Sequence, residues 1–323
     1  MDENKEILVS VICLTYNHER YIRECVDSLI NQKTSFKYEI LIHDDCSTDK
    51  TTQILKEYER RYPKIIRIIL QNENQYTKGK RIVEEIVLPI ANGRYIAFCE
   101  GDDYWIDSKK LQKQIDALKE YPECWICAHN VKKIDTISKK KIGNVAPSNK
   151  NKILSIEEVI DGDGGFVGTN SLVINRKAFE MNYEFEKMYS LDYFIQIMGS
   201  LHGGMLYLAD EMSVYRTGVE NSWTRFMEHN IDEYSLHLNR IILTLKKLDE
   251  ETKERYHDVI NKKICCQKFK RIYARREYKL LLKKSNCEIV KVMSLDEKFK
   301  VVIKIIFPWI DDLIVMWRKK VAK

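Results

Sequence analysis

The chain lacks any apolar run long enough to cross a membrane. It has 323 residues, of which 44% are hydrophobic and 32% charged, whereas a spanning helix needs about 20 consecutive apolar residues. The nearest approach, residues 301–317, is interrupted by Lys304, Pro308, Asp311 and Asp312. The N-terminal segment has acids and a lysine before a short apolar run without a small-residue cleavage site, unlike a secretory signal. We therefore expect a folded cytoplasmic protein with enough chain for a buried core.

Three common nucleotide and metal motifs are also missing. The sequence has no GxGxxG, no GxxxxGKS/T and no HExxH pattern, which removes the usual support for Rossmann dehydrogenases, P-loop enzymes and zincins. Its nine cysteines are odd in number and scattered, which suits a reducing compartment better than a disulfide framework. The CxxC pair Cys124 and Cys127 has no second pair and no histidine at ligand spacing, so we expect buried thiols there.

Charge is distributed unevenly along the chain. The 54 basic and 48 acidic residues give a net charge of +6. Residues 262–323 alone hold 18 Lys and Arg against 6 Asp and Glu, so this tail carries +12 and the preceding chain −6. A basic tail can face nucleic acid, acidic lipid headgroups or water, so the asymmetry alone does not select a partner.

Short apolar runs alternate with segments of helical period over the first 130 residues or so. This alternation is typical of βα units that build a mostly parallel sheet, and it predicts an α/β fold. We expect strands at 8–15, 38–43, 65–70 and 95–99. Ser47, Thr48 and Asp49 offer N-cap side chains for a helix with Ile54 and Leu55 on its inner face.

Three of the predicted strands end in polar residues. These are Thr15, Tyr16 and Asn17; Asp44, Asp45 and Asp49; and Glu100, Asp102 and Asp103. Ligands of open α/β sheets bind beyond the carboxyl ends of the strands. Clustered carboxylates repel one another and are costly to bury, so such an edge requires a cation or hydrogen-bond donors. Mg²⁺ or Mn²⁺, with the phosphates of a nucleotide completing the coordination, fits this set better than an all-protein calcium site.

At these residues the sequence resembles the family 2 glycosyltransferases, which are inverting enzymes of the nucleotide-diphospho-sugar (GT-A) fold. The likeness spans roughly residues 7–222. The family's first strand runs into Thr-Tyr-Asn, as at Thr15-Tyr16-Asn17, and its second into Asp-Asp-Gly-Ser-x-Asp, where this chain has Cys46 in place of glycine. The stretch from Asn92 to Trp105 resembles the metal-binding DxD region, with Glu100 in the first acidic place, and is the most specific match.

The resemblance implies roles for these residues. Asp45, together with Asp44, would meet the base and ribose of a nucleotide-sugar, and Thr15, Tyr16 and Asn17 belong to the same binding site. Asp102 would meet both the diphosphate and a Mn²⁺ or Mg²⁺ ion, with Glu100 and Asp103 as further metal ligands.

Two downstream segments extend the likeness. Gly168-Thr169-Asn170-Ser171 precedes an apolar run, and Leu191-Asp192-Tyr193 opens an apolar helix. In similar enzymes an acidic residue at this point deprotonates the acceptor hydroxyl, so we predict that Asp192 is the catalytic base. Transfer with inversion needs a base on the face opposite the leaving nucleotide. The alternative role for Asp192 is an acid favoured by the helix dipole.

Residues 215–223 resemble the closing segment of the family but depart from it in part. Tyr215-Arg216 and Asn221-Ser222-Trp223 match, whereas Thr217-Gly218-Val219-Glu220 differs from the usual pattern and the histidine is absent. Arg216 either pairs with the diphosphate, for which its guanidinium is suited, or forms a structural salt bridge.

Residues 223–323 form a second region, for which apolar spacing from Ile231 to Leu248 predicts a helix. A second helix is expected to start near Glu251, and basic residues then alternate with apolar ones. Such a region can contact an anionic membrane, pack on residues 1–222 or form a homodimer. No nucleic-acid-binding motif accompanies the charge, so no nucleic acid partner is expected.

The sequence thus predicts a metal-dependent inverting glycosyltransferase of bacterial surface glycan synthesis in the cytoplasm, and the inner face of the plasma membrane is one location that the basic tail allows. The donor is a nucleotide-diphosphate sugar, with a UDP-sugar favoured, and the acceptor a saccharide or lipid-linked saccharide. Two alternatives remain: a nucleotidyltransferase of related fold and a non-catalytic nucleotide-sugar or lipid-binding module. The first would need a Gly-rich, Arg-containing first loop, which residues 15–19 do not offer.

Overall fold

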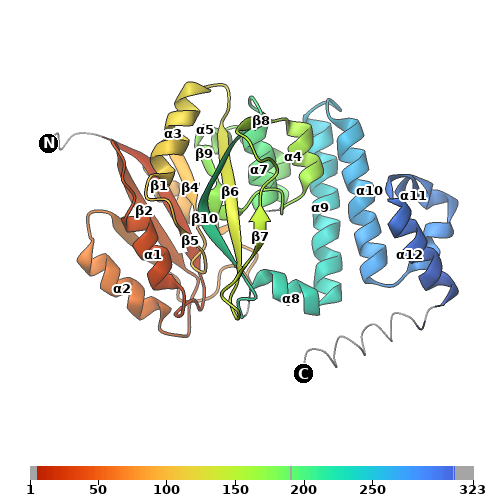
Figure 1. Cartoon of the computed structure of the whole chain (residues 1–323), viewed down its shortest axis with the longest axis horizontal. Coiled ribbons are helices and arrows are strands. Elements are labelled where there is room, and N and C mark those ends of the chain that lie inside the picture. Colours follow the sequence, from red (N-terminus) through yellow and green to blue (C-terminus); the bar gives the residue numbers. More distant parts are fainter. Residues whose placement is uncertain (1–5, 190, 221, 308, 310–323) are drawn as a thin grey trace. The chain divides into compact units, whose positions relative to one another are not determined.

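The computed structural model describes residues 6–189, 191–220, 222–307 and 309. The chain divides into two compact units, Met1–Ser222 and Trp223–Lys323 (Figure 1). Asn221 of the predicted closing segment and most of the apolar stretch after 307 lie outside the described residues. Over the described residues, no helix is both long and apolar enough to span a bilayer.

The first unit is built on one mixed sheet, in which ten strands of the described chain take part. Its order is β3-β2-β1-β4-β9-β6-β10-β5, with β7 paired to β6 and β8 to β10. The strands are β1 (Ile7–Thr15), β2 (Lys37–Asp44), β3 (Ile66–Leu70), β4 (Tyr95–Phe98), β5 (Tyr104–Trp105), β6 (Ile126–Asp135), β7 (Lys141–Val145), β8 (Lys152–Leu154), β9 (Val173–Asn175) and β10 (Met205–Thr217). Strands β3, β2, β1 and β4 run parallel, whereas β9 is antiparallel to both β4 and β6.

Helices cover this sheet and bury its apolar side chains. They are α1 (Ile22–Ile30), α2 (Thr51–Arg61), α3 (Lys110–Glu120), α4 (Ile156–Gly162), α5 (Lys177–Glu180), α6 (Glu184–Met188) and α7 (Asp192–Ser200), with a π-helix η1 (Ile82–Val87) and 3₁₀ turns η2 (Leu88–Ile90) and η3 (Thr169–Ser171). One core joins Val11 and Ile40 of the sheet to Leu29 of α1 and Leu55 of α2. The predicted strands and the inner face of α2 are confirmed to within a residue or two.

Two local expectations have different outcomes. Of the three predicted cap side chains, Asp49 accepts the N–H of Thr51, the first residue of α2, at 2.9 Å. Ser47 and Thr48 do not cap α2, whose N-cap residue Lys50 makes no side-chain cap. Ser47 and Thr48 instead hydrogen-bond to Asn17 in the loop after β1. Cys124 and Cys127 are buried and free, as expected.

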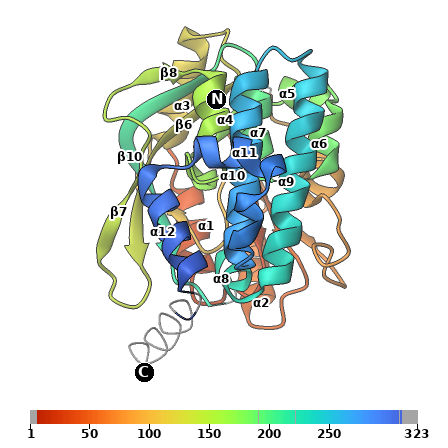
Figure 2. The ribbon, with the colours of Figure 1, turned by 90° about the vertical axis from the view of Figure 1, so that its right-hand side faces the viewer.

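The second unit is helical in its described part. It contains α8 (Trp223–His229), α9 (Ile231–Glu251), α10 (His257–Ala274), the turns η4 (Tyr278–Leu282) and η5 (Lys284–Asn286), α11 (Cys287–Val292) and α12 (Leu295–Ile306). Helices α9 and α10 lie side by side (Figure 2). The predicted face of α9 is buried from Leu238 to Leu248, but Ile231 is exposed. The second helix starts at His257 rather than near Glu251, because 252–256 form a turn.

Candidate active site

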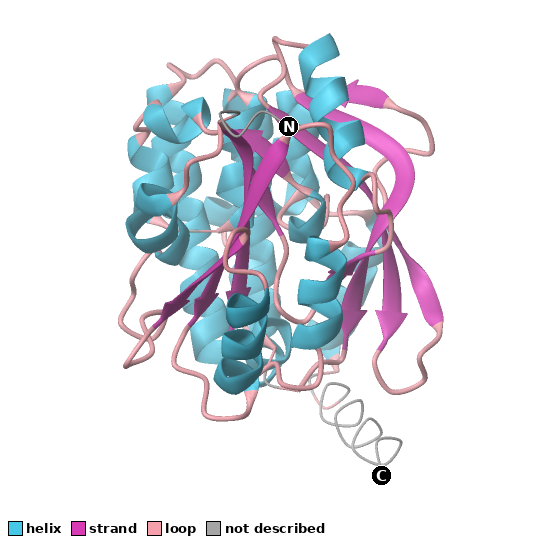
Figure 3. Cartoon of the chain, turned by 90° about the vertical axis from the view of Figure 1, so that its left-hand side faces the viewer, coloured by secondary structure: helices cyan, strands magenta, loops and turns pink. Residues whose placement is uncertain are grey.

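The carboxyl ends of β1, β2 and β4 meet at one edge of the sheet. Thr15 at the end of β1 is paired with Asp44 at the end of β2, and Ile12 of β1 is paired with Phe98 of β4. Arrowheads of neighbouring strands point to this edge in Figure 3. Beyond β4, the Gly101 N–H donates to the Leu14 carbonyl at 2.8 Å, so the polar loop runs alongside β1. The three polar segments predicted at strand ends are therefore neighbours.

Hydrogen bonds join the loops that follow β1 and β2. The Asn17 N–H donates to Ser47 Oγ at 2.9 Å, and Asn17 Oδ1 accepts from the Thr48 N–H at 2.7 Å. Asp44 is buried and accepts hydrogen bonds from the hydroxyls of Ser47 and Thr52. Asn17 and Asp44 thus fix the backbone of both loops.

Asp45 holds a third loop at the same edge. Its buried carboxylate accepts hydrogen bonds from the N–H groups of Gln75 at 2.7 Å and Tyr76 at 3.0 Å. Cys46 follows with a φ of 67°, a left-handed conformation that glycine adopts without steric cost. Within the first loop Thr15 is buried and Tyr16 is exposed, so Tyr16 is the side chain available to a ligand.

The loop after β4 carries three carboxylates in different surroundings. Asp103 is only 1% exposed; its Oδ1 accepts from the Arg216 N–H at 3.0 Å and its Oδ2 from Asn170 Nδ2 at 2.9 Å. Glu100 and Asp102 are half-buried. Burial, and then the charge of Asp102, raises the pKa of Glu100 to about 8 and raises the pKa of Asp103 well above its usual range. A cation at this loop would relieve that repulsion and lower both pKa values.

Arg216 of β10 lies against the same loop. Its buried guanidinium donates to the Asp102 carbonyl oxygen and forms an ion pair with Glu24 of α1. It also lies over the rings of Tyr104 at 4.4 Å and Tyr21 at 5.1 Å. The structure therefore contains the salt bridge that we considered as one role for Arg216, and it places this salt bridge directly beside Asp102.

Asp192 is the first residue of α7. Its Oδ2 accepts a hydrogen bond from Thr169 Oγ1 at 2.5 Å, and its Oδ1 accepts the Tyr193 N–H at 2.7 Å. Burial raises the pKa of Asp192, the Thr169 hydrogen bond opposes this, and the charge of Asp163 adds to it. The charge of Asp192 in turn raises the pKa of Glu100. The predicted base therefore lies within electrostatic reach of the acidic loop, which is the loop after β4 that carries Glu100, Asp102 and Asp103.

One short turn, η3, donates hydrogen bonds both to Asp192 and to Asp103 of the acidic loop. Thr169 donates to Asp192, whereas the next residue, Asn170, donates to Asp103 and to the Val214 carbonyl at 3.0 Å. Asn170 Oδ1 accepts from the Ser213 hydroxyl at 2.9 Å, which ties the turn to β10. The spacing between the acidic loop and the predicted base is therefore fixed by two adjacent side chains.

The model of the family described as "Glycosyl transferase family 2" matches residues 10–219, which include all the site residues above. The chain belongs to glycosyl transferase family 2. The predicted family is thereby confirmed, and with it a role in sugar transfer.

Named relatives agree with this assignment. An uncharacterized protein of Mycobacterium tuberculosis (strain H37Rv) is 35% identical over 215 residues, which are 67% of this chain and 60% of that protein. The Escherichia coli UDP-Glc:alpha-D-GlcNAc-diphosphoundecaprenol beta-1,3-glucosyltransferase WfaP is 42% identical over 112 residues, 35% of this chain and 41% of that protein. The chain thus spans less than two thirds of the length of either relative.

Solved structures of low identity share the fold. TarS 1–349 of S. aureus, in complex with UDP-GlcNAc, has a TM-score of 0.62 at 17% identity and covers 88% of this chain and 79% of its own. The mannosyltransferase PcManGT of Pyrobaculum calidifontis, in complex with GDP-Man and Mn²⁺, has a TM-score of 0.52 at 13% identity and covers 95% of this chain and 89% of its own. The predicted GT-A fold with C-terminal helices is confirmed.

The acidic loop of this family 2 chain offers a suitable donor set for a divalent cation. Among the described residues, no group of three or more His, Cys, Asp or Glu side chains forms a complete metal site. Mg²⁺ and Mn²⁺ need only one or two carboxylates when substrate phosphates supply the remaining ligands. Asp102 accepts no side-chain hydrogen bond within the described part of the chain, and Glu100 lies two residues away, so these two fit. Both oxygens of Asp103 already accept hydrogen bonds from the protein, which makes Asp103 the least available of the three predicted ligands.

The structure adds residues that sequence reasoning missed. His18 Nδ1 lies 3.1 Å from Thr15 Oγ1; burial lowers the pKa of His18, and the charge of Asp102 opposes this. A Cβ at Gly101 would lie 2.6 Å from Thr15 Oγ1 and 2.8 Å from His18 Nδ1, so glycine allows the acidic loop to pass these two side chains. His18 adjoins the Thr-Tyr-Asn motif and could have been found by that position. Glu24, by contrast, is 192 positions from Arg216, and no local pattern marks it.

Proposed function

We propose that this family 2 chain transfers a sugar from a nucleotide-diphosphate donor to a hydroxyl group, with inversion at the anomeric carbon. A UDP-sugar is the favoured donor, because WfaP is named for UDP-Glc and TarS was solved with UDP-GlcNAc. A saccharide or lipid-linked saccharide of bacterial surface glycan synthesis is the proposed acceptor, as the name of WfaP suggests.

The donor would lie along the shared edge of β1, β2 and β4. The proposed nucleoside-binding residues are Thr15, Tyr16, Asn17, Asp44 and Asp45. Tyr16 is exposed, whereas Thr15, Asp44 and Asp45 are buried and hold the loops of this edge in place. Arg216, whose guanidinium lies beside the Asp102 carbonyl, is proposed to meet the diphosphate. Mn²⁺ or Mg²⁺, held by Asp102 with Glu100 and Asp103, would neutralise charge that develops on the departing diphosphate.

Asp192 is the proposed base, and its position beside the acidic loop supports this mechanism. Its carboxylate would remove the proton of the acceptor hydroxyl while that oxygen bonds to the anomeric carbon. The bond from that carbon to the diphosphate oxygen breaks with its electron pair on the nucleotide, so no covalent enzyme intermediate forms. The observation in support is that η3 holds Asp192 and the acidic loop together through Thr169 and Asn170.

We further propose that residues 1–222 are the catalytic domain and residues 223–323 a helical region that contacts anionic membrane at the cytoplasmic face. Homodimer formation is the alternative role for that region. No nucleic acid partner is proposed, because no motif for one accompanies the basic charge.

Thermal shift tests the site. The chain is melted with UDP, GDP, dTDP or CMP, each with and without Mn²⁺, alongside the Asp102→Ala variant. A ligand at 100 times its Kd stabilises by about 2.7 kcal/mol, which raises the melting temperature by roughly 5 °C. We expect a shift with UDP that needs Mn²⁺ and disappears in the variant. NMR of the glycosidic product then reports inversion, and an Asp192→Asn variant that keeps full transfer would remove Asp192 as base.

A further inference from the structure

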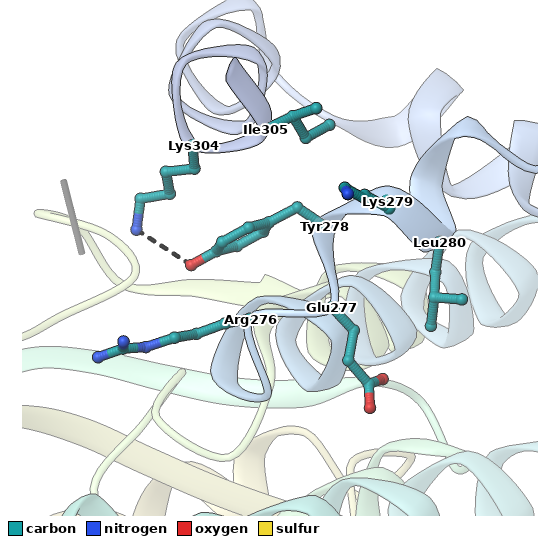
Figure 4. Close-up of a pocket in the computed structure, with 7 residues that line it drawn as sticks. All are labelled: Arg276, Glu277, Tyr278, Lys279, Leu280, Lys304 and Ile305. Atoms are coloured by element: carbon teal, nitrogen blue, oxygen red, sulfur yellow. Dashed lines mark hydrogen bonds between the residues drawn. The ribbon is translucent and has the colours of Figure 1, made fainter. Parts of the chain in front are cut away.

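Helix α12 packs on its own unit through one narrow face. Val301 is buried in a small core with Tyr278 and Leu281, and Ile305 packs against the same cluster. Lys304 reaches from α12 to the Tyr278 hydroxyl at 3.3 Å, beside a groove of about 470 Å³ (Figure 4). Val301, Lys304 and Ile305 thus define the packed face.

The outward face of α12 is apolar instead of polar. Leu295, Phe299, Val302 and Ile306 are between 51% and 85% exposed. Their spacing of four, three and four residues places them in one stripe, roughly opposite Val301 and Lys304 around the helix. The exposed aromatic rings of Phe307 and Trp309 follow directly in the chain. A continuous exposed apolar surface of this kind marks a docking site.

Basic residues flank this stripe and continue around the helix. Lys298 and Lys300 lie on either side of Phe299, and Lys300 forms an ion pair with Asp296 at 2.5 Å. On the packed side of α12, the groove is lined by Arg276, Lys279 and Lys304 with one acid, Glu277. Residues 262–307, all of which the structure describes, hold 14 Lys and Arg against 4 Asp and Glu. A second copy of this chain would present the same positive charge to the stripe, whereas an anionic bilayer presents the opposite charge.

We propose that the outward face of α12 docks on an anionic bilayer surface. Leu295, Phe299, Val302 and Ile306 enter the headgroup region, and Lys298 and Lys300 reach lipid phosphates on either side. This inference rests on the membrane contact proposed above for residues 223–323 and assigns it to one helix face. It is independent of sugar transfer.

Vesicle flotation of the full chain, without nucleotide, tests the surface. The vesicles are phosphatidylcholine alone or equal parts of phosphatidylglycerol and phosphatidylcholine. We expect flotation only with the anionic vesicles, weakened by salt. Phe299→Ser/Val302→Ser should raise the lipid concentration for half-maximal binding roughly tenfold or more, because two apolar side chains no longer enter the bilayer. The matched control is Ile137→Ser/Ile142→Ser, which removes two exposed apolar side chains of the first unit and should bind as the native chain does.

Several results would overturn the proposal. Equal binding of the native chain to both vesicles, or unchanged binding of the Phe299 variant, excludes anionic docking by this face. If the native chain binds neither vesicle and sediments as a dimer that the variant abolishes, the face contacts a second copy. If it binds neither vesicle and sediments as a monomer, the face is covered by other residues of the same chain. If the double variant has a lower melting temperature than the native chain, the flotation test is repeated with Leu295→Ser and with Lys298→Gln/Lys300→Gln. The nucleotide thermal shift of each variant shows separately whether the donor site survives.

Discussion

The acidic residues at the sheet edge differ in what surrounds each side chain. Asp44 accepts from two hydroxyls, Asp45 from two backbone N–H groups, and Asp103 from one N–H and one amide. Asp102 accepts no side-chain hydrogen bond in the described part of the chain. A buried carboxylate that accepts two hydrogen bonds is stabilised without a ligand. Asp102 has no such donors, so it is the carboxylate that the proposed metal ion would stabilise most.

Thr169 should tune the pKa of the proposed base. Its hydroxyl hydrogen bond lowers the pKa of Asp192, so Thr169→Val should raise that pKa. Because the base acts deprotonated, the rising limb of the kcat–pH profile should move to higher pH by about one unit. Thr169→Ser keeps the hydroxyl and should restore the native profile. Glu100 and Asp163 also act electrostatically near Asp192, but both are present in the two variants. If Thr169→Ser moved the kcat–pH profile as far as Thr169→Val does, the hydroxyl would not be what sets the pKa of Asp192.

Replacing Cys46 by glycine should stabilise the protein slightly. Its φ of 67° is a strained conformation for a residue with a Cβ. Cys46→Gly should raise the free energy of unfolding by about 0.5 to 1 kcal/mol, measured by urea denaturation. Cys46→Ala keeps the Cβ and is the control. If both variants gain equally, the thiol rather than the backbone conformation is the cause.

At the scale of elements, the 3₁₀ turn η3 connects parts of the sheet that are distant in sequence. Asn170 joins Asp103 of the acidic loop to Ser213 and Val214 of β10. The indole N–H of Trp105 in β5 also donates to the Asn170 carbonyl at 3.0 Å. The turn therefore acts as a brace under the acidic loop.

Removing that brace should destabilise the first unit. Asn170→Ala removes the donor to Asp103 Oδ2 and one donor to the Val214 carbonyl, both of them buried, so we expect a loss of about 3 kcal/mol in the free energy of unfolding. Asn144→Ala is the control, because Asn144 is exposed and its loss should cost less than about 0.5 kcal/mol. Chemical denaturation followed by tryptophan fluorescence measures both. Equal losses would mean that the Asn170 hydrogen bonds contribute little.

At the scale of the whole molecule, the two units differ in charge and in proposed task. Every residue assigned to the donor site lies in Met1–Ser222, whereas the basic excess and the apolar stripe lie in Trp223–Lys323. Ligand binding stabilises the part of a protein that holds the ligand.

Hydrogen exchange should therefore separate the units. With UDP and Mn²⁺, peptides covering 15–19, 44–49, 71–80 and 100–104 should exchange more slowly, because their loops meet at one edge. Peptides of α9 to α12 should be unchanged. Anionic vesicles should give the reverse pattern, with slower exchange in α12. Protection of α12 by nucleotide alone would contradict the division of roles.

Local pattern determined the elements and the family. The apolar runs predicted β1 to β4 and the inner face of α2, because strand and helix periods are properties of a few successive residues. The Thr-Tyr-Asn and acidic motifs identified the family and their common edge, because parallel strands bring their carboxyl ends together.

Only the tertiary structure decided what each of these residues contacts. The sequence predicted Ser47, Thr48 and Asp49 as helix caps; Asp49 accepts the Thr51 N–H, whereas Ser47 and Thr48 hydrogen-bond to Asn17. It left Arg216 between two roles, and Glu24, far away in the chain, supplies its ion pair. It marked 262–323 as basic but not which face of α12 is apolar and exposed. Hydrogen-bond partners and helix faces depend on long-range packing, which no local pattern specifies.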